Sequence, residues 1–564
     1  MRGRLVVIGL ALVAIVIAFT ASQGGGDDKG GAARSKAGAS ADGPAGALNI
    51  TFVHSTEKAA LIKRLVDGFN AARVRSGGRV VHVRALSVAS GEAETRIAAG
   101  GLRPVVWSPA SSLWGTLLNY DAKREMVARD NPSLARTPLV IAMWETFARV
   151  LGWPKQKVGW EQILRLARSP KGWALYGKSG FPAFKLGHTN PDFSTSGLSA
   201  VAGEYYAATG KREGLTLADV DRPAVRREIR DIEASIVHYG STTPFFSEQL
   251  LHYGSAFAQA VAMEETTLID FNRRRGAREP LVALYPKGGT FFSDNPVAIV
   301  KAPWVTPPMR AAGEAFSAWI RKRATPQFVA RFGFRPGDPD AKPAAPIDRA
   351  HGADPAQPAI TLALPQPRVL SQIKKRWRED RKAANVMLVV DTSGSMSDEG
   401  KMDQAKRGLR VFFDQLAPQD RVGIITFSSK VRPVLPIARF SHTREDVEAA
   451  VSDMTPDGET ALYDATLAGV RAVRRLDDPK RINAVVLLTD GNRTTGSVDL
   501  GTLLKELKAV SPVEERTVRV FAISYGADAS VGPLKEIAAA TGGQQFTGDP
   551  REIGAVYQSI SSFF

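Results

Sequence analysis

The chain has 564 residues, of which 44% are hydrophobic and 23% charged, and its formal net charge is +17. This length exceeds a single hydrophobic core, so we expect two or three domains. Cysteine is absent, which excludes disulfides, thiolate metal sites and a catalytic cysteine. The basic residues are spread along the chain without a Lys/Arg block. We therefore expect no nucleic-acid partner, and the charge suits an anionic membrane surface or an acidic cell envelope.

The N-terminus has the pattern of a secretory signal. Arg2 and Arg4 precede an unbroken apolar run that ends at Phe19, and such a run after basic residues directs export. Because its length approaches that of a membrane-spanning helix, we expect residues 1–23 to form a signal anchor with the N-terminus inside. Cleavage of the signal, giving a secreted protein, is the alternative. We expect residues 24–47 to be a flexible spacer, with the rest of the chain outside the cytoplasm.

Between residues 48 and 337, segments with the pattern of strands alternate with segments with the pattern of helices. Such alternation predicts an α/β architecture with a parallel sheet. A helix with Leu61, Leu65 and Phe69 on one apolar face follows the first expected strand. We expect strands at residues 48–53, 79–86, 105–107, 138–144, 281–284 and 295–300, and further helices at residues 92–99 and 307–322.

Two hydroxyl-rich turns, at residues 106–112 and 187–198, lie ahead of expected helices. With the order of segments, they resemble the type II periplasmic solute-binding proteins, in which two α/β lobes close on a ligand. The resemblance implies a small solute or an oxyanion at helix N-termini, where backbone N–H groups favour an anion. The alternative is that the hydroxyls cap their own helices. The candidate ligand contacts are Ser55, Ser108, Ser111, Ser194 and Ser196.

Residues 338–383 separate this region from the next. The first part is rich in Pro and Ala and predicts a linker. A basic helical stretch follows at residues 369–382. We expect this helix to be solvated and to pack Trp377 on the domain that follows it, with contact to the envelope or a partner as the alternative.

Residues 384–564 again alternate between strand and helix patterns. This predicts an open, doubly wound parallel sheet with helices on both faces, which binds ligands outside the carboxyl ends of its strands. We expect strands at residues 386–390, 421–427, 484–489 and 518–523, and helices at residues 402–416, 444–454, 461–476 and 533–540.

Five polar residues meet at that edge if the sheet forms as expected. Asp391, Ser393 and Ser395 follow the first buried strand, Asp490 follows a second, and Thr460 lies in a loop before a helix. Two carboxylates and three hydroxyls around one point suit a hard divalent cation, because such cations take oxygen ligands.

With these residues, the chain from residue 385 onward closely resembles the von Willebrand factor type A (VWA) domain, which is Rossmann-like. The metal-ion-dependent adhesion site of that family is an Asp-x-Ser-x-Ser turn, a loop Thr and a strand-end Asp. These fall on the five residues above, with none missing. The resemblance implies Mg²⁺ as cofactor, with Mn²⁺ or Ca²⁺ as alternatives, and a protein partner whose acidic residue completes the metal's ligand shell.

An enzyme is not expected. The seven histidines form no His-Glu-x-x-His pair, and no Gly-x-Ser-x-Gly elbow is present. The expected function is that of a membrane-tethered extracellular protein that uses a Mg²⁺-dependent VWA domain for recognition or adhesion, coupled to a solute-binding-like domain. The alternatives are a solute receptor of a transport system with the VWA domain as docking module and, with less support, a metal-dependent hydrolase.

Overall fold

The fold is described from a computed structural model, in which residues 43–564 are described apart from 238, 277, 515, 527–528 and 549–552. The expected signal anchor at residues 1–23 and most of the expected spacer lie outside the described residues. Among the described residues, no helix is both long enough and apolar enough to span a membrane.

The first lobe, here called lobe 1, surrounds a five-stranded sheet. It contains β1 (Leu48–His54), α1 (Ala59–Ala71), β2 (Arg75–Ser76), β3 (Arg79–Ser87), α2 (Ser90–Ala98), β4 (Val106–Ser108), α3 (Ser112–Asp121), β10 (Ala298–Ile299) and α11 (Pro307–Arg323). The strand order is β10-β4-β1-β3-β2, with β1 parallel to both β3 and β4. Helix α1 buries Leu61, Leu65 and Phe69, because residues three to four apart share one helix face.

The second lobe, here called lobe 2, is built around the long strand β5. It contains β5 (Ala135–Trp144), α4 (Glu145–Val150), α5 (Trp160–Arg168), β6 (Leu186–His188), α6 (Thr195–Thr209), α7 (Leu217–Asp221), α8 (Pro223–Ala234), α9 (Thr243–Tyr253), β7 (Ala260–Glu264), α10 (Glu265–Arg274), β8 (Leu281–Leu284), β9 (Phe292–Ser293), α12 (Pro326–Ala330) and β11 (Arg335–Pro336). The sheet order is β11-β5-β7-β6, and β8 and β9 also pair with β5.

The two lobes touch directly, in addition to the strands that pass between them. The backbone N–H of Gly91 in lobe 1 donates to Phe193 O in lobe 2 at 2.8 Å. Trp114 Nε1 donates to Thr195 Oγ1, also at 2.8 Å. The approach at Gly91 requires glycine, because a Cβ there would lie 2.2 Å from Asp192 O. The structure is therefore a closed arrangement of the two lobes.

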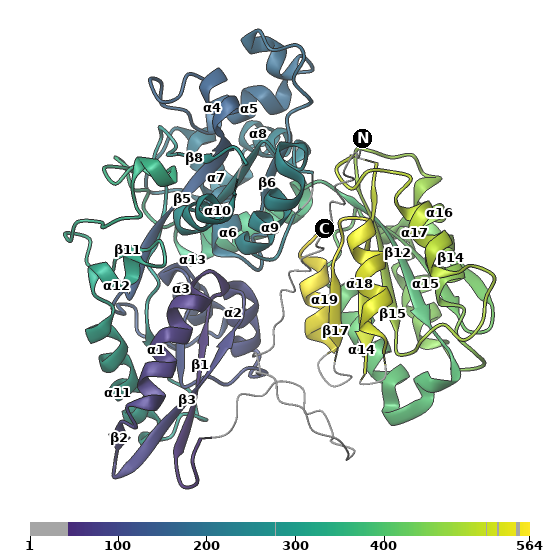
Figure 1. The fold of residues 1–564 in the computed structure, drawn as a ribbon, viewed down its shortest axis with the longest axis horizontal. Coiled ribbons are helices and arrows are strands. Elements are labelled where there is room, and N and C mark those ends of the chain that lie inside the picture. The colour runs from purple at the N-terminus through teal and green to yellow at the C-terminus, as the bar shows by residue number, and fades with distance from the viewer. Residues whose placement is uncertain (1–42, 238, 277, 515, 527–528, 549–552) are drawn as a thin grey trace, which may run out of the picture.

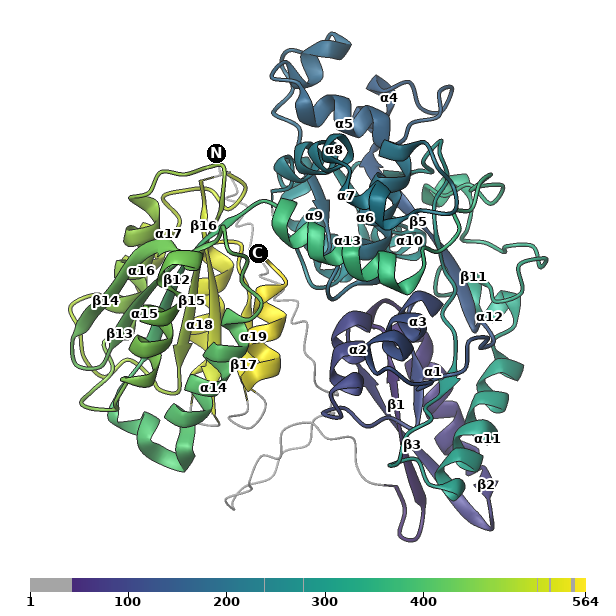
Figure 2. The same ribbon diagram turned by 180° about the vertical axis from the view of Figure 1, so that it is seen from behind.

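The linker expected at residues 338–383 packs against the preceding lobes. Ile347 and Leu362 are buried, and Thr361 bridges to Thr290 of lobe 2. Helix α13 (Pro367–Asp380) follows and contacts α3 of lobe 1 together with α6, α7 and α8 of lobe 2. Figure 2 shows α13 lying where the two lobes meet.

The expected position of Trp377 is wrong. Its ring packs on Tyr239 of lobe 2, with 5.1 Å between ring centroids, and not on the domain that follows. The reason is the apolar stripe of α13, which buries Leu370, Ile373 and Trp377 on a single face. That face is turned toward the helices of the lobes.

The C-terminal domain is a doubly wound α/β sheet, as the sequence predicts. It contains β12 (Ala384–Asp391), α14 (Lys401–Phe413), β13 (Arg421–Phe427), β14 (Val431–Arg439), α15 (Phe440–Ser452), α16 (Leu462–Arg474), β15 (Ile482–Thr489), α17 (Leu500–Leu507), β16 (Val518–Tyr525), α18 (Val531–Ala540), β17 (Gln545–Gly548) and α19 (Ile553–Ser561). The strand order is β14-β13-β12-β15-β16-β17. All neighbours are parallel except the edge strand β14, which runs antiparallel to β13.

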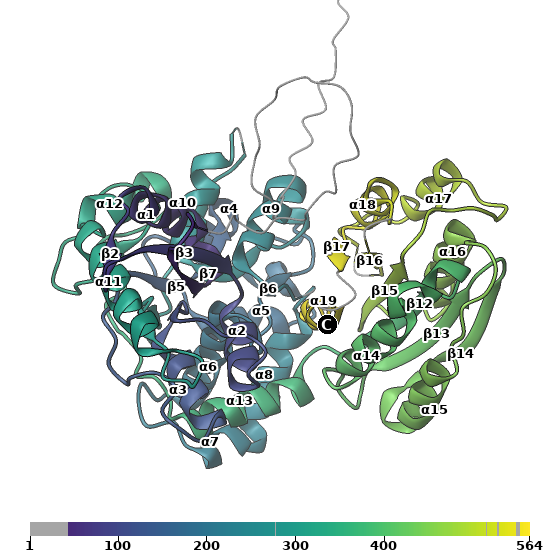
Figure 3. The same cartoon turned by 90° about the horizontal axis from the view of Figure 1, so that it is seen from below.

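Alternate residues of the central strands face opposite layers of helices, because strand side chains point to the two sheet faces in turn. Val386 and Leu388 pack with α14, α15 and α19, whereas Met387 and Val389 pack with α16, α17 and α18. Figure 3 shows these two layers on either side of the sheet. The continuous apolar run in β12 follows from this burial on both faces.

The C-terminal domain lies beside the two lobes and touches lobe 2 (Figure 1). Lys185 Nζ of lobe 2 donates to Val513 O at 2.7 Å, and the rings of Phe245 and Phe563 are 5.1 Å apart. Arg381, just after α13, forms a buried ion pair with Asp420 at 2.6 Å. This pair anchors the amino end of β12, where the chain enters the domain.

Candidate functional site

The turn after β12 is organised around a buried carboxylate. Asp391 is fully buried at the end of the strand. Its Oδ1 accepts the backbone N–H of Ser393 at 2.8 Å, and its Oδ2 accepts Thr489 Oγ1 at 2.6 Å. Burial raises the pKa of Asp391 to about 6, although both hydrogen bonds favour the charged form. These bonds fix the carboxylate relative to the ends of two neighbouring strands.

The remaining expected side chains converge on the same edge. Ser395 Oγ donates to Asp490 Oδ1 at 2.7 Å and lies 3.2 Å from Ser393 Oγ. A Cβ placed on Gly491 would lie 3.6 Å from Thr460 Oγ1 and 3.9 Å from Ser395 Oγ. The structure thus brings all five predicted residues together at the carboxyl end of the sheet.

The loop that carries Thr460 is held to the first turn by backbone hydrogen bonds. The N–H of Gly394 donates to Gly458 O at 3.0 Å, and the N–H of Asp457 donates to Thr392 O at 2.7 Å. Gly458 has a φ of +68°, in the left-handed region, which glycine adopts without strain. The loop conformation therefore depends on the glycine two residues before Thr460.

One charged residue of this site was not predicted from the sequence. Lys401, the first residue of α14, is buried, and its Nζ lies 2.7 Å from Asp490 Oδ2. The available signal was a lysine at the start of the helix after the Asp-x-Ser-x-Ser turn. With two aspartates and one lysine, the site carries a formal charge of −1.

The donor set fits a hard divalent cation. Among the predicted ligands the available atoms are all carboxylate and hydroxyl oxygens, which Mg²⁺ prefers. Four of the five residues are buried, while Ser395 is exposed at the rim, so the edge is open to a ligand from outside. A bound dication would change the formal charge from −1 to +1, which favours an acidic group of a partner.

The hydroxyls predicted as solute contacts lie on both lobes, and all are buried. In lobe 1, Ser111 Oγ caps α3 by accepting Leu113 N at 3.3 Å, which is the alternative predicted for these residues. Ser55 Oγ donates to Glu57, and Ser108 Oγ has no partner among the described residues. Ser55 N and Ser108 O are joined at 3.2 Å, so the two residues are adjacent.

In lobe 2, Ser194 and Ser196 form a chain of hydroxyls at the start of α6. Ser196 Oγ lies 3.0 Å from Ser194 Oγ and 2.8 Å from Thr189 Oγ1. Ser194 is the N-cap residue of α6, but its side chain makes no capping bond. The hydroxyls are thus linked to one another at the interlobe contact beside Phe193.

Charged side chains near the interlobe contact also affect which solute could bind there. Buried Lys58 donates to Pro109 O at 2.9 Å and to Asn295 Oδ1 at 2.8 Å. Burial raises the pKa of Glu264 to about 8, and repulsion from Glu57 adds to the effect. With a pKa of about 8, Glu264 is mostly protonated at neutral pH, so its carboxyl can donate a hydrogen bond to a polar solute. These three residues were not singled out from the sequence.

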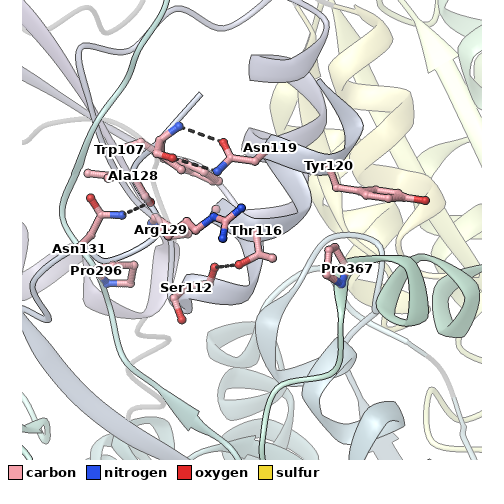
Figure 4. A pocket seen from close by; sticks show the side chains of 14 residues that line it. Trp107, Ser112, Thr116, Asn119, Tyr120, Ala128, Arg129, Asn131, Pro296 and Pro367 are labelled. Atoms are coloured by element: carbon pink, nitrogen blue, oxygen red, sulfur yellow. Dashed lines mark hydrogen bonds between the residues drawn. The ribbon is translucent and has the colours of Figure 1, made fainter. Parts of the chain in front are cut away.

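A separate hollow of about 480 Å³ opens on lobe 1 against the N-terminus of α13. Figure 4 shows its walls, with Asn119 bonded to the neighbouring loop and Pro367 on the opposite side. Asn119 also accepts Met126 N at 2.7 Å. Thr116 and Asn131, which also line the hollow, donate to neighbouring backbone oxygens, so these polar groups are engaged within lobe 1.

The fold and the site define a two-part α/β binding protein, with a two-lobed domain followed by a doubly wound domain that carries an oxygen-rich site. The model of the bacterial extracellular solute-binding protein family matches residues 50–335, half of the chain, and the chain belongs to that family. The model of the von Willebrand factor type A domain matches residues 385–553.

Curated relatives match through the C-terminal domain. The chain is 29% identical over 168 residues to inter-alpha-trypsin inhibitor heavy chain H4 of Bos taurus, covering 28% of this chain and 18% of that protein. It is 28% identical over 134 residues to the uncharacterized protein YfbK of Escherichia coli strain K12, covering 22% of each. The chain thus spans about a fifth of the length of these relatives.

Solved structures match each part at low identity. A von Willebrand factor type A protein from Catenulispora acidiphila has 22% identity and a TM-score of 0.29, covering 32% of this chain and 42% of that one. A periplasmic thiamin binding protein has 12% identity and a TM-score of 0.43, covering 61% of this chain and 99% of that one.

Proposed function

We propose that this protein is an extracellular recognition protein whose C-terminal domain binds a partner's acidic residue through a divalent cation. The observation that carries the proposal is the convergence of the five oxygen-bearing residues at an edge with one exposed member, Ser395. Mg²⁺ is the proposed cation, because it takes oxygen ligands and keeps waters that a partner can displace. The proposed ligands are Asp391, Ser393, Ser395, Thr460 and Asp490.

The residues of the chain have separate tasks in this proposal. Asp391 and Asp490 supply the negative charge, and their hydrogen bonds to Thr489 and Ser395 hold them in place. The cation, when bound, supplies a positive centre at which a carboxylate of a partner can bind. Lys401 neutralises part of the aspartate charge, so a single dication makes the edge net positive.

The proposed setting is the outer face of a cell membrane, with residues 1–23 as an uncleaved anchor and 24–47 as spacer. Membership in an extracellular solute-binding family supports an extracellular location. We propose residues 48–337 as a solute-binding domain, 338–383 as linker and basic helix, and 384–564 as the VWA domain. The proposed ligand of the first domain is a small polar solute, with Ser55, Ser108, Ser111, Ser194 and Ser196 at the interlobe contact.

A second candidate function is that of a solute receptor whose C-terminal domain is a docking module. It is favoured by α13, which contacts both lobes and leads directly into the C-terminal domain. In that arrangement, a change between open and closed lobes would reach the C-terminal domain through the linker. A metal-dependent hydrolase has less support, because the sequence contains neither a His-Glu-x-x-His pair nor a Gly-x-Ser-x-Gly elbow.

The test is capture of envelope proteins by the full chain in Mg²⁺ and in EDTA. We expect Mg²⁺-dependent capture by the wild type, none by Asp391→Ala, and unchanged capture by Asp446→Ala. Asp446 is an exposed aspartate on α15 of the same domain and serves as the matched control. Capture that survived both EDTA and Asp391→Ala would contradict the proposal.

A further inference from the structure

A second group of potential metal ligands lies in the interior of lobe 2, far along the chain from the site at Asp391. It consists of His188 on β6, Glu204 on α6 and Glu233 on α8, all fully buried. One ligand atom from each residue lies within 4.8 Å of the others. Three elements separated in sequence therefore direct an imidazole and two carboxylates to one point.

Two of these side chains are held in place by hydrogen bonds. His188 Nδ1 lies 2.7 Å from Thr189 O, so Nδ1–H donates to this carbonyl and Nε2 is the ring nitrogen that faces the carboxylates. Its Nε2 lies 3.0 Å from Glu233 Oε1. Glu233 Oε2 accepts the hydroxyl of Tyr239 at 2.5 Å. The outer bonds to Thr189 and Tyr239 are of the kind that orients metal ligands.

Glu204 differs from His188 and Glu233 in its hydrogen bonds. Neither of its carboxylate oxygens has a hydrogen-bond partner among the described residues, although the side chain is 1% exposed. Burial, with repulsion from Glu233, raises the pKa of Glu204 well above its usual value. An unpartnered buried carboxylate is costly, so the charged form of Glu204 beside Glu233 needs a cation to compensate it, and without one a proton does so.

We propose that His188, Glu204 and Glu233 bind a divalent transition metal, with Zn²⁺ as the probe that best represents the class. A neutral imidazole and two carboxylates carry a charge of −2, which one dication cancels. Imidazole nitrogen with carboxylate oxygen is a donor set that suits Zn²⁺ and similar ions. The site is structural, because it is closed to solvent. It is independent of the proposed function of the C-terminal domain.

The site lies next to the residues of lobe 2 that contact α13. Tyr239, bonded to Glu233, also accepts the backbone N–H of Lys382 at 3.2 Å and packs against Trp377. The metal would therefore fix the surface of lobe 2 on which α13 ends. Loss of the metal is expected to loosen α13 as well as lobe 2.

The experiment uses the full chain with Asp391→Ala, so that the C-terminal site does not contribute. The protein is stripped with chelator, unfolded and refolded with Zn²⁺, because a closed site would admit the ion slowly. Metal content by mass spectrometry and the thermal midpoint are then measured. We expect one tightly bound Zn²⁺ and a higher midpoint, as for any ligand that binds only the folded state.

Two further variants in the same background separate the site from adventitious binding. Glu204→Gln keeps the shape but removes a charge, and we expect Zn²⁺ affinity to fall by at least about tenfold. Glu94→Gln, at another buried glutamate with an unpartnered oxygen, in lobe 1, should leave binding unchanged. No Zn²⁺ after refolding, or equal affinity in Glu204→Gln, would overturn the proposal and leave a proton-sharing cluster of His188 and the two glutamates.

Discussion

At the scale of single residues, the C-terminal site is defined by how two aspartates are supported. Asp391 is fixed by a backbone N–H and a threonine hydroxyl, and Asp490 by Ser395 and Lys401. The convergence of the five oxygen-bearing residues could be predicted because they form a spaced pattern at strand ends and in one loop. The place of Lys401 in the site could not be predicted, because the sequence of a helix start does not show whether an isolated lysine there is buried or solvated.

The Lys401–Asp490 pair gives a prediction on stability. Without divalent cation, Lys401→Met should lower the free energy of unfolding of the C-terminal domain by about 3–5 kcal/mol, because it leaves a buried carboxylate unpaired. Mg²⁺ should restore much of this loss, since the dication takes over the role of the ammonium. Urea unfolding with Mg²⁺ or with EDTA measures both effects.

Lys406→Met is the control for this experiment, because Lys406 is on the same helix and donates to Ser452 O at the surface. It should change stability by no more than about 0.5 kcal/mol, with no dependence on Mg²⁺. A Lys401→Met protein that Mg²⁺ fails to stabilise would show that the aspartates do not hold the cation.

At the scale of elements, α13 is the part whose role the sequence predicts least well. Its helical character and basic side chains could be inferred from residues 369–382. The position of α13 could not be predicted, because an apolar stripe with Trp377 does not indicate which neighbouring element it packs against. The same holds for the edge strands β14 and β17, whose short or exposed segments lack the continuous apolar run of β12.

The contacts of α13 with lobe 2 predict how the lobes are held. Arg378 donates to both oxygens of Asp192, at 2.6 and 2.9 Å, and Lys374 lies 3.6 Å from the same carboxylate. Lys374 also lies 5.5 Å from the centroid of the Trp114 ring in lobe 1. One helix therefore contacts both lobes through neighbouring basic residues.

Arg378→Ala should weaken the closed arrangement. We expect a loss of about 1–2 kcal/mol in unfolding free energy, because Arg378 is partly exposed, and a larger radius of gyration in solution scattering. Lys375→Ala, at an exposed lysine of the same helix, is the control and should change neither. Unchanged scattering from Arg378→Ala would show that α13 does not hold the lobes.

The Asp192 pair also predicts a dependence on pH. Burial alone would raise the pKa of Asp192, but Arg378 and Lys374 outweigh it and hold the pKa below its usual value. A lowered folded-state pKa stabilises the protein above the unfolded pKa of about 4, and the contribution is lost as pH falls further. The difference between wild type and Arg378→Ala should therefore persist at neutral pH and shrink in acid.

At the scale of the whole molecule, the proposed metal site and the contacts with the lobes lie at opposite ends of the C-terminal sheet. Arg381 pairs with Asp420 where β12 begins, and Asp391 ends the same strand. Eight residues of strand span roughly 25 Å. The site can therefore meet a partner while the other end of the domain stays attached to α13 and lobe 2.

The central claim is that Asp391, Thr460 and their neighbours bind a divalent cation, and calorimetric titration of Mg²⁺ into the full chain tests it most directly. Glu204→Gln is included in every sample, so that the interior of lobe 2 does not contribute. The account predicts one Mg²⁺ site, weakened at least about tenfold by Thr460→Ala and unaffected by Thr443→Ala on α15. A chain that binds no Mg²⁺, or binds it equally well with Thr460→Ala, would contradict it.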